Sequence, residues 1–340
     1  MRLNNVPMRV IKSIVSVYEL KGKQDLFKKQ SPEILTRLQE IARIQSTESS
    51  NRIEGIEVSN IKLKEIMLEK AAPRDRSEAE ISGYRDVLAT MHSSFPHIPI
   101  KSQIIQQLHR DMYKYLPQPG GSWKAIDNVI EETLPNGSIK IRFKPVKPHL
   151  VPSEIEELCQ KFNNYRDRGE IDDLLLIFCF ILDFLCIHPF TDGNGRISRL
   201  LTILTLYQAG FEVGRYISLE RIIEQSKETY YDALFKSSQG WHEREHNPLP
   251  WIEYSLGIIL AAYREFEDRV NLAENQRGTK SSLIRDAIRR FRGDFTIRDI
   301  EQTCPNISRP TIYRVLEALK SEGVIDCIVS GRNARWCKKI

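Results

Sequence analysis

Residues 188–199 read HPFTDGNGRISR, and no other segment constrains the chain as strongly. An almost uninterrupted apolar run, residues 174–187, comes directly before this segment and predicts a central helix over 172–187 that is buried on nearly every face. Pro189 ends that helix, and the next one is predicted to begin around Gly195. A loop rich in ionisable groups is therefore expected directly at the C-terminal end of the buried helix.

The chemistry of this loop favours a site for a phosphate-bearing ligand. A helix that begins at glycines presents unpaired N–H groups, and the helix dipole adds positive potential there. Arg196 and Arg199 lie one turn apart on this helix, and each guanidinium can fork onto phosphate oxygens. His188 is a candidate base because imidazole titrates near neutrality, and Asp192 is a candidate magnesium ligand. Together these residues indicate a nucleoside triphosphate site.

The segment matches the Fic signature H-x-F-x-[DE]-G-N-G-R-x-x-R at every defined position, so the chain resembles the Fic family over roughly residues 30–265. The resemblance implies a mainly α fold, in which a Fic helical core carries a small β-hairpin flap. It also implies a nucleotidyltransferase that uses ATP and Mg²⁺. Such an enzyme moves AMP to a Tyr, Thr or Ser hydroxyl of a target protein or of itself.

The resemblance implies a role for each motif residue. His188 is expected to be the catalytic base, and Asp192 is expected to bind the nucleotide through Mg²⁺. Arg196 is expected at the β-phosphate and Arg199 at the γ-phosphate. The full set of expected nucleotide-binding residues is Asp192, Gly193, Asn194, Gly195, Arg196, Ser198, Arg199, Tyr230 and Tyr231, with the two tyrosines beside the adenine.

A hairpin is expected before the core motif. Short β-type runs at 128–130 and 138–143 flank Asn136-Gly137, a pair typical of tight hairpin turns. The resemblance implies that Ile141, Arg142 and Phe143 belong to the family's flap. A target segment would add to the flap as a strand and present its hydroxyl to the α-phosphorus.

A second motif precedes the core. Ser50, Glu54 and Gly55 fit the pattern [ST]-x-x-x-E-[GN], which one class of Fic proteins carries on an inhibitory helix. A carboxylate from that helix would pair with Arg199 whenever no γ-phosphate is present. The γ-phosphate would then lose its arginine, and ATP would bind in an unproductive pose. The chain is therefore expected to restrain its own activity.

Charge and periodicity divide the chain into three parts. Residues 280–340 hold 13 Lys+Arg and 7 Asp+Glu, a balance of +6 against +5 for the whole chain, which hints at a polyanionic partner. A polar segment, 274–280, is typical of a linker. The expected domains are an N-terminal helical region with the inhibitory helix (1–95), the Fic catalytic core (96–273) and a separate domain (280–340). Helices are predicted at 32–41, 60–70, 78–91, 101–113, 153–167, 171–187, 196–208, 227–237 and 249–274.

The last part resembles a winged-helix domain. Helices are predicted at 282–288, 297–303 and 308–319, and a strand that begins at 323 returns over 334–337. In that family the third helix enters the major groove and the hairpin wing touches the DNA backbone. The residues expected to contact DNA are Arg309, Thr311, Tyr313, Arg314, Arg332 and Arg335. Winged helices also dock proteins or dimerise, so DNA, a protein and a second copy of the chain all remain candidate partners.

Composition argues for a cytoplasmic protein without a membrane partner. The N-terminal residues lack a signal-peptide apolar region, and the longest apolar run is too short to span a bilayer. The six cysteines have neither C-x-x-C nor zinc-ligand spacing. Two alternative functions stay open: a DNA-binding, nucleotide-sensing regulator of the toxin–antitoxin kind, and a Fic enzyme that uses another nucleotide donor or removes AMP. The intact His188 favours catalysis, since a sensor needs only the anion site.

Overall fold

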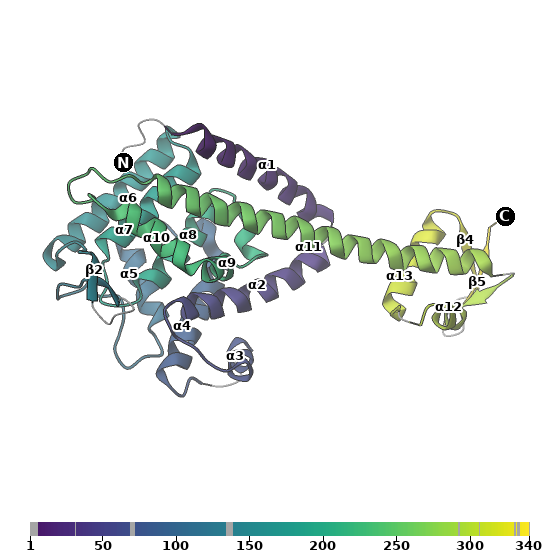
Figure 1. The fold of residues 1–340 in the computed structure, drawn as a ribbon. Coiled ribbons are helices and arrows are strands. Elements are labelled where there is room, and N and C mark those ends of the chain that lie inside the picture. The colour runs from purple at the N-terminus through teal and green to yellow at the C-terminus, as the bar shows by residue number, and fades with distance from the viewer. Residues whose placement is uncertain are drawn as a thin grey trace. The chain divides into compact units, whose positions relative to one another are not determined.

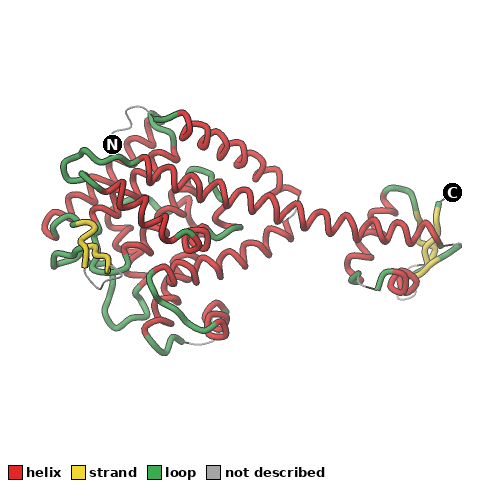
Figure 2. The backbone as a smooth tube through the Cα atoms, viewed as in Figure 1, coloured by secondary structure: helices red, strands yellow, loops and turns green. Residues whose placement is uncertain are grey.

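The computed structural model describes residues 6–30, 32–68, 72–133, 139–291, 293–305, 307–329, 331 and 334–339. Most of them are helical, and their strands form two small antiparallel sheets (Figure 2). This agrees with the predicted mainly α class. The chain divides into two compact units, residues 1–267 and 268–340.

The first unit is a helical assembly with one hairpin (Figure 1). Its helices are α1 (Met8–Gln30), α2 (Pro32–Ile53), α3 (Asn60–Met67), α4 (Arg76–Ser94), α5 (Ser102–Met112), α6 (Val151–Arg168), α7 (Asp173–Ile187), α8 (Asn194–Gln208), α9 (Leu219–Gln225), α10 (Lys227–Ser238) and the start of α11 (Leu249–Arg290). The hairpin joins β1 (Ile130–Thr133) to β2 (Ile139–Phe143). Short 3-10 turns lie at η1 (Phe95–His97), η2 (Pro148–Leu150) and η3 (Val213–Arg215).

Helix α7 forms the core of this unit because thirteen of its fifteen residues are buried. Helices α6, α8 and α10 pack against it. Asp172 caps its start by accepting hydrogen bonds from the N–H groups of Leu174 and Leu175, at 3.0 and 3.3 Å. The helix ends at His188, whose backbone is left-handed with φ of 51°. The chain therefore turns sharply into the motif loop where the buried helix stops.

The second unit contains the end of α11, β3 (Phe295–Thr296), α12 (Ile297–Thr303), α13 (Arg309–Ser321), β4 (Ile325–Val329) and β5 (Arg335–Lys338). Its strands form an antiparallel sheet in the order β3-β5-β4. A capping box between Thr296 and Asp299 begins α12. A core that includes Ile284, Leu316 and Trp336 holds the helices on the sheet. The predicted order of three helices and a hairpin is present, with β3 as an additional strand.

Two expectations about the organisation differ from the structure. Residues 274–280, expected as a linker, continue α11, which runs unbroken from Leu249 to Arg290. Glu, Asn, Gln and Arg are all compatible with a helix, and one glycine costs only about 1 kcal/mol. Residues 1–95 also lie in the same compact unit as most of 96–273, because α2 and α4 pack against α8. The predicted turn at Asn136-Gly137 lies outside the described residues.

None of the helices in the described ranges is both long enough and apolar enough to cross a bilayer.

Candidate functional site

The motif loop is shaped by the side chain of Asn194. Its Nδ2 donates to the Phe190 carbonyl at 2.7 Å, and its Oδ1 accepts from the Phe190 N–H at 2.9 Å. Both residues are buried. Since both polar atoms of its amide bond Phe190, the Asn194 side chain fixes the backbone of the loop from inside.

Aromatic rings from α5 hold the loop from behind. The His109 ring lies parallel to Phe190 with centroids 3.8 Å apart, and Tyr113 stacks on His109 at 4.5 Å. His109 Nδ1 accepts from the Gly121 N–H at 2.8 Å, so we assign its proton to Nε2, which donates to the Asp192 carbonyl at 3.1 Å. Sequence reasoning missed His109 and Tyr113, because nothing in the local pattern of α5 distinguishes them from ordinary packing residues.

His188 is held as a neutral base. Its Nδ1 lies 3.3 Å from the Leu185 carbonyl, an arrangement that puts the proton on Nδ1 and leaves the Nε2 lone pair free. Burial lowers the pKa of His188 to about 4; the Lys124 ammonium contributes to this shift, and the Leu185 carbonyl, Glu54 and Asp192 oppose it. The imidazole is therefore unprotonated at pH 7, which is the state that a general base requires.

His188 faces a pocket of about 480 Å³, a size typical of small-molecule sites. Its lining includes Glu54, Gly195 and Arg199. Aromatic and aliphatic side chains of the hairpin and α10 also line it, among them Phe143, Tyr231, Leu234 and Phe235. The structure thus joins the N-terminal motif, the core motif, the hairpin and α10 in one cavity.

Arg199 is buried and bonded to α2. Its Nη2 donates to Glu54 Oε1 and to the Ser50 carbonyl, and its Nε donates to Ser50 Oγ, each at 2.8 Å. Burial alone would lower the pKa of Arg199, but the Glu54 carboxylate raises it above its usual value. Nη1 has no partner among the described residues. Arg199 therefore keeps one buried N–H donor group unused in this state.

Gly195 permits the approach of Glu54. A Cβ at this position would lie 2.2 Å from Glu54 Oε1, so any other residue would push the carboxylate away. The end of α2 aims Glu54 at this gap: Gly55 is left-handed with φ of 79°, and the Ile56 N–H donates to the Asn51 carbonyl at 3.0 Å. The three residues of the N-terminal motif, Ser50, Glu54 and Gly55, each take part in this arrangement.

Arg196, the residue expected at a β-phosphate, is not among the residues that line this pocket. It is 1% exposed; its Nη1 donates to Glu80 Oε2 at 2.5 Å and its Nη2 to the Tyr113 hydroxyl at 3.0 Å. Removing a buried charge from its partner is costly, so Arg196 is held as a brace between α8, α4 and α5. Ser198 is buried as well and donates to the Gly195 carbonyl at 2.7 Å.

Asp192 lies at the surface of the loop with its side chain 57% exposed. Its Oδ1 accepts from the Gly193 N–H at 2.6 Å, and its Oδ2 lies 3.4 Å from Arg76 Nη2. Gly193 itself, with φ of 80°, is the N-cap of α8. No group of three or more His, Cys, Asp or Glu side chains in the described ranges is placed to hold a metal ion. A single carboxylate fits a magnesium ion whose other ligands are phosphates and waters.

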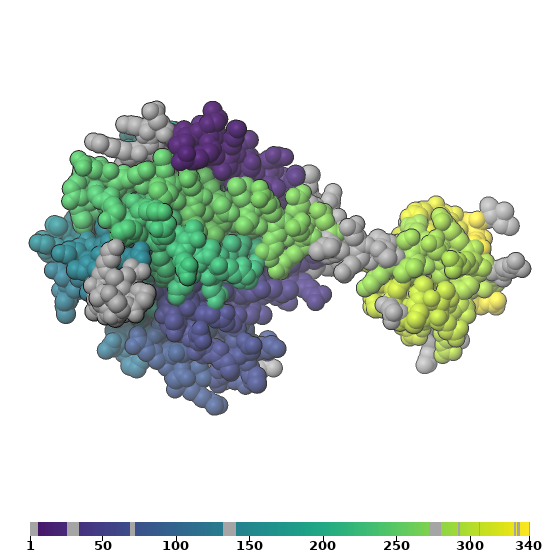
Figure 3. Space-filling model, viewed as in Figure 1, coloured from purple at the N-terminus to yellow at the C-terminus, as the bar shows by residue number. Residues whose placement is uncertain are grey.

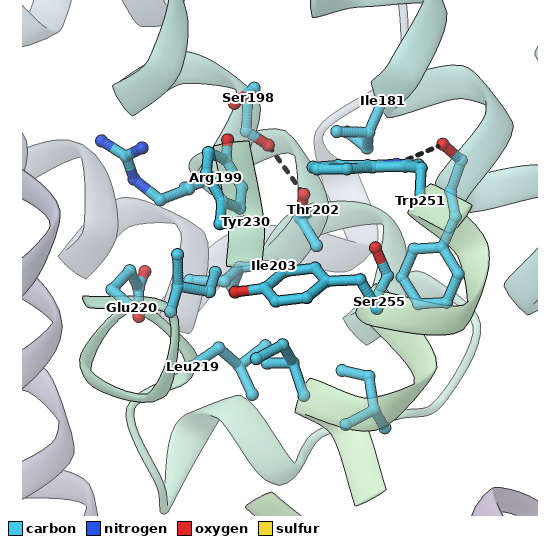
Figure 4. Close-up of a pocket in the computed structure, with 15 residues that line it drawn as sticks. Ile181, Ser198, Arg199, Thr202, Ile203, Leu219, Glu220, Tyr230, Trp251 and Ser255 are labelled. Atoms are coloured by element: carbon cyan, nitrogen blue, oxygen red, sulfur yellow. Dashed lines mark hydrogen bonds between the residues drawn. The ribbon is translucent and has the colours of Figure 1, made fainter. Parts of the chain in front are cut away.

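The two tyrosines of α10 have different surroundings. Tyr230 is buried and packs edge-on against Trp251 at 5.4 Å, whereas Tyr231 is partly exposed on the pocket wall. Behind Tyr230 lies a second cavity of about 40 Å³, with Arg199 and Glu220 at one side and Trp251 at the other (Figure 4). This cavity can hold water molecules and no nucleotide.

The hairpin forms the rim of the pocket. Ile130 pairs with Phe143 and Glu131 with Ile141, with a bulge between the two pairs. Arg142 and Phe143 line the pocket, and the Arg142 guanidinium lies 5.1 Å from the centre of the Phe235 ring. Ile141 is half-exposed and does not line it.

Four of the residues expected to contact DNA are exposed in the second unit. Arg309, Tyr313 and Arg314 are exposed on α13, and Arg335 is exposed on β5. Arg309 forms an ion pair with Glu301, and Arg335 lies 3.2 Å from Asp294. Thr311 is half-buried and its hydroxyl lies 3.1 Å from that of Ser308. Arg332 lies outside the described residues.

Buried histidines predict how stability depends on pH. Burial lowers the pKa of His92, His109 and His188 to about 4, so the fold holds them neutral while the unfolded chain protonates them below about 6.5. Their contribution to stability is complete above pH 6.5 and is lost as the pH falls towards 4. We expect the urea midpoint to drop between pH 6.5 and 4.5. The drop should be smaller in His92→Gln, and an equal drop in that variant would contradict the assignment.

A family comparison agrees with the geometry. Residues 99–206 match the model of the Fic/DOC family. The chain is 38% identical over 64 residues to a Fido domain-containing protein of Dictyostelium discoideum, a match over 19% of this chain and 45% of that protein. It is 25% identical over 191 residues to a probable protein adenylyltransferase of Aquifex aeolicus (strain VF5), over 55% of this chain and 53% of that protein. The matches thus span about half the length of these relatives.

Solved structures share the fold. A Fic family protein from Desulfovibrio desulfuricans G20 superimposes with a TM-score of 0.66 at 18% identity, over 100% of this chain and 98% of that one. Fic-1 from Caenorhabditis elegans superimposes with a TM-score of 0.62 at 20% identity, over 78% of this chain and 74% of that one. At these identities the similarity establishes the fold alone.

Proposed function

We propose that this chain, which carries a Fic domain at residues 99–206, is a protein adenylyltransferase that transfers AMP from ATP to a protein hydroxyl. One observation carries the proposal: a neutral His188 shares a pocket with Arg199 and the start of α8. The hydroxyl oxygen would attack the α-phosphorus, and the bond from that phosphorus to the pyrophosphate would break. His188 would take the hydroxyl proton on Nε2.

The lining of the pocket suits both the phosphates and the base of ATP. The N-terminus of α8 and the unpartnered Nη1 of Arg199 both favour phosphate. The same pocket offers aromatic faces, with Tyr231 and Phe235, on which a nucleobase can stack. Asp192 would hold Mg²⁺, which neutralises charge on the leaving pyrophosphate when bound.

The hairpin is the proposed docking site for the target. β1 and β2 pair with each other at the rim of the pocket, and the structure shows no further strand of the described residues beside them. An extended target segment would pair with a free edge and bring its acceptor hydroxyl beside His188. The acceptor is then any Tyr, Thr or Ser in that segment, either in another protein or in this one.

Glu54 is the proposed inhibitor. It occupies Arg199 at 2.8 Å and lies against Gly195, where the γ-phosphate would otherwise bind. The γ-phosphate must displace Glu54 to reach its arginine, so ATP that binds with Glu54 in place is held unproductively.

Position-specific labelling tests the reaction. The Glu54→Gly chain is incubated with Mg²⁺ and ATP labelled at either the α- or the γ-phosphorus, alone and with a cell lysate. We expect protein-bound label from α-labelled ATP only. Label from γ-labelled ATP would indicate phosphoryl transfer. If only another labelled nucleotide gave protein-bound label, that nucleotide would be the donor. Loss of AMP from a labelled protein would indicate the reverse reaction.

The basic face of α13 favours DNA binding as a second function. Tyr313 and Arg314 are exposed there, in a segment with six excess positive charges. We expect duplex DNA to bind with strong salt dependence and Arg314→Ala to weaken binding about 5- to 150-fold, as one lost base contact does. Lys236→Ala, an exposed lysine of the first unit, is the control. Absence of salt-dependent binding would favour the protein-docking alternative.

A further inference from the structure

Helix α1 carries a row of apolar side chains that face solvent. Met8, Ile11, Val15 and Tyr18 are 64, 41, 60 and 38% exposed. Their spacing of three, four and three residues places them on one stripe of the helix. Tyr18 is the partly covered end of the row, because its ring packs edge-on against Phe211 with the centroids 5.2 Å apart. Single exposed apolar residues are ordinary, but a contiguous row marks an interaction surface. Figure 3 shows α1, in purple, at the surface of the first unit.

The opposite face of α1 already attaches the helix to its own unit. Val10, Ile14 and Val17 are buried there. Arg9 and Lys23 add ion pairs to Glu253 and Glu267 of α11. One apolar face is enough to hold a surface helix, so the second face is not explained by folding of the single chain.

The charges beside the row are arranged symmetrically. Lys12 and Glu19 are both exposed and lie on the same flank of the stripe, three residues before and four residues after Val15. If two α1 helices pack antiparallel about Val15, Lys12 of each copy meets Glu19 of the other, so two ion pairs form. In a parallel pair both charges would lie on one side of the seam and would not meet. The surface is thus self-complementary only in the antiparallel arrangement.

Gly22 completes the row and fits the same arrangement. It is exposed in the middle of a helix, where glycine costs about 1 kcal/mol relative to alanine, and a Cβ there would have no atom within 4 Å. In an antiparallel pair centred on Val15, Gly22 of one copy lies opposite Met8 of the other, since both are seven residues from the centre. The missing side chain leaves space for the long methionine.

We propose that α1 is a homodimer interface in which two copies of the chain pack their α1 helices antiparallel, with the two-fold axis at Val15. The partner is a second copy because the apolar row and its flanking charges complement themselves. One helix pair is at the small end of specific interfaces, so the dissociation constant is expected in the micromolar range. The proposal does not depend on the enzymatic function, and none of its residues lines the active-site pocket.

Sedimentation velocity of the full chain from about 1 to 100 μM tests the association, a range that brackets micromolar affinity. We expect a concentration-dependent shift from monomer to dimer. Val15→Glu places two like charges at the axis and should give a monomer. Ile61→Glu, at a 75% exposed position on α3, is the matched control and should dimerise like the wild type. Circular dichroism and the urea midpoint establish that both variants are folded.

Two further variants test the geometry. Lys12→Glu and Glu19→Lys should each weaken the dimer, and the double swap should restore it. Val15→Cys should be linked between copies by a short bismaleimide, with the wild type as the background for its six native cysteines. Met8→Cys should not be, because antiparallel pairing separates the two positions by about 20 Å.

A chain that stays monomeric at all concentrations would overturn the proposal, and so would a dimer that survives Val15→Glu. Linking through Met8→Cys without linking through Val15→Cys would replace the antiparallel pair by a parallel one.

Discussion

Replacing Glu54 with glycine should raise the initial rate of AMP transfer about 10- to 150-fold, the equivalent of one hydrogen bond between charged groups at 1.5–3 kcal/mol. In the wild-type chain, Glu54 holds Arg199 at 2.8 Å, and the arginine is 4% exposed. The γ-phosphate must therefore break an ion pair whose arginine is buried and whose carboxylate side chain is 31% exposed before it can bind. The glycine variant removes that competitor and leaves the turn at the end of α2 intact.

The measurement is the rate of label transfer from α-labelled ATP at subsaturating nucleotide. Glu57→Gly is the matched control, because Glu57 lies on the same segment, has its side chain 68% exposed and is 3.9 Å from Arg52. Glu54→Gln keeps the shape of the side chain without the charge and should fall between wild type and Glu54→Gly. If Glu54→Gly and Glu57→Gly label at the wild-type rate, Glu54 is not an inhibitor.

Loss of the imidazole at position 188 should lower the transfer rate about 10²- to 10⁴-fold, the range of general base catalysis. The comparison is made between Glu54→Gly and Glu54→Gly/His188→Ala, so that the starting rate is high. Since His188 is proposed to act on the acceptor hydroxyl and not on the phosphates, the affinity for ATP, measured by calorimetry, should change little. His149→Ala, an exposed histidine on η2, should have no effect.

The pH profile provides an independent check on the same residue. Because the pKa of His188 is lowered to about 4, the base form is present throughout the neutral range and is lost only as the pH falls towards 4. The rate in the Glu54→Gly chain should be flat from pH 6 to 8. A rate that falls twofold near pH 6.5 would mean that the imidazole titrates as it does in water.

The local sequence pattern predicted those elements whose start, end and burial are determined by neighbouring residues. Helix α12 has the predicted bounds, Ile297 to Thr303, because Thr296 and Asp299 supply a capping box that can be read directly. Helix α7 and its end at His188, where the backbone is left-handed, follow from an apolar run that is succeeded by a proline. Helix α1 and the unbroken α11 were missed, since mixed polar composition suits a helix and an exposed segment equally well.

Within the site, the motif predicted which residues gather but not which of them reach the pocket. Arg196 and Asn194 belong to the motif, yet Arg196 is bonded to Glu80 and Asn194 to Phe190. The partner that decides this for Arg196, Glu80 on α4, is 116 positions away in the sequence, whereas Phe190 lies only four residues before Asn194. No spacing rule connects residues as far apart as Arg196 and Glu80, so only the packing of α4 against α8 reveals their contact.

Because Glu54 directly follows the last residue of α2, binding of a nucleotide in the pocket and docking of α2 against the rest of the first unit weaken each other. Helix α2 is fastened to α9 by the bond from Ser46 Oγ to Ser218 Oγ at 2.9 Å, and near Glu54 by the bond from Lys227 Nζ to the Ile53 carbonyl at 2.7 Å. By thermodynamic linkage, the factor by which the docked helix lowers the affinity for ATP equals the factor by which bound ATP lowers the equilibrium constant for docking of the helix. Saturating nucleotide should thus speed amide hydrogen exchange at the end of α2. Any molecule that binds across α2 and α9 and stabilises their contact would lower the affinity for nucleotide without entering the pocket.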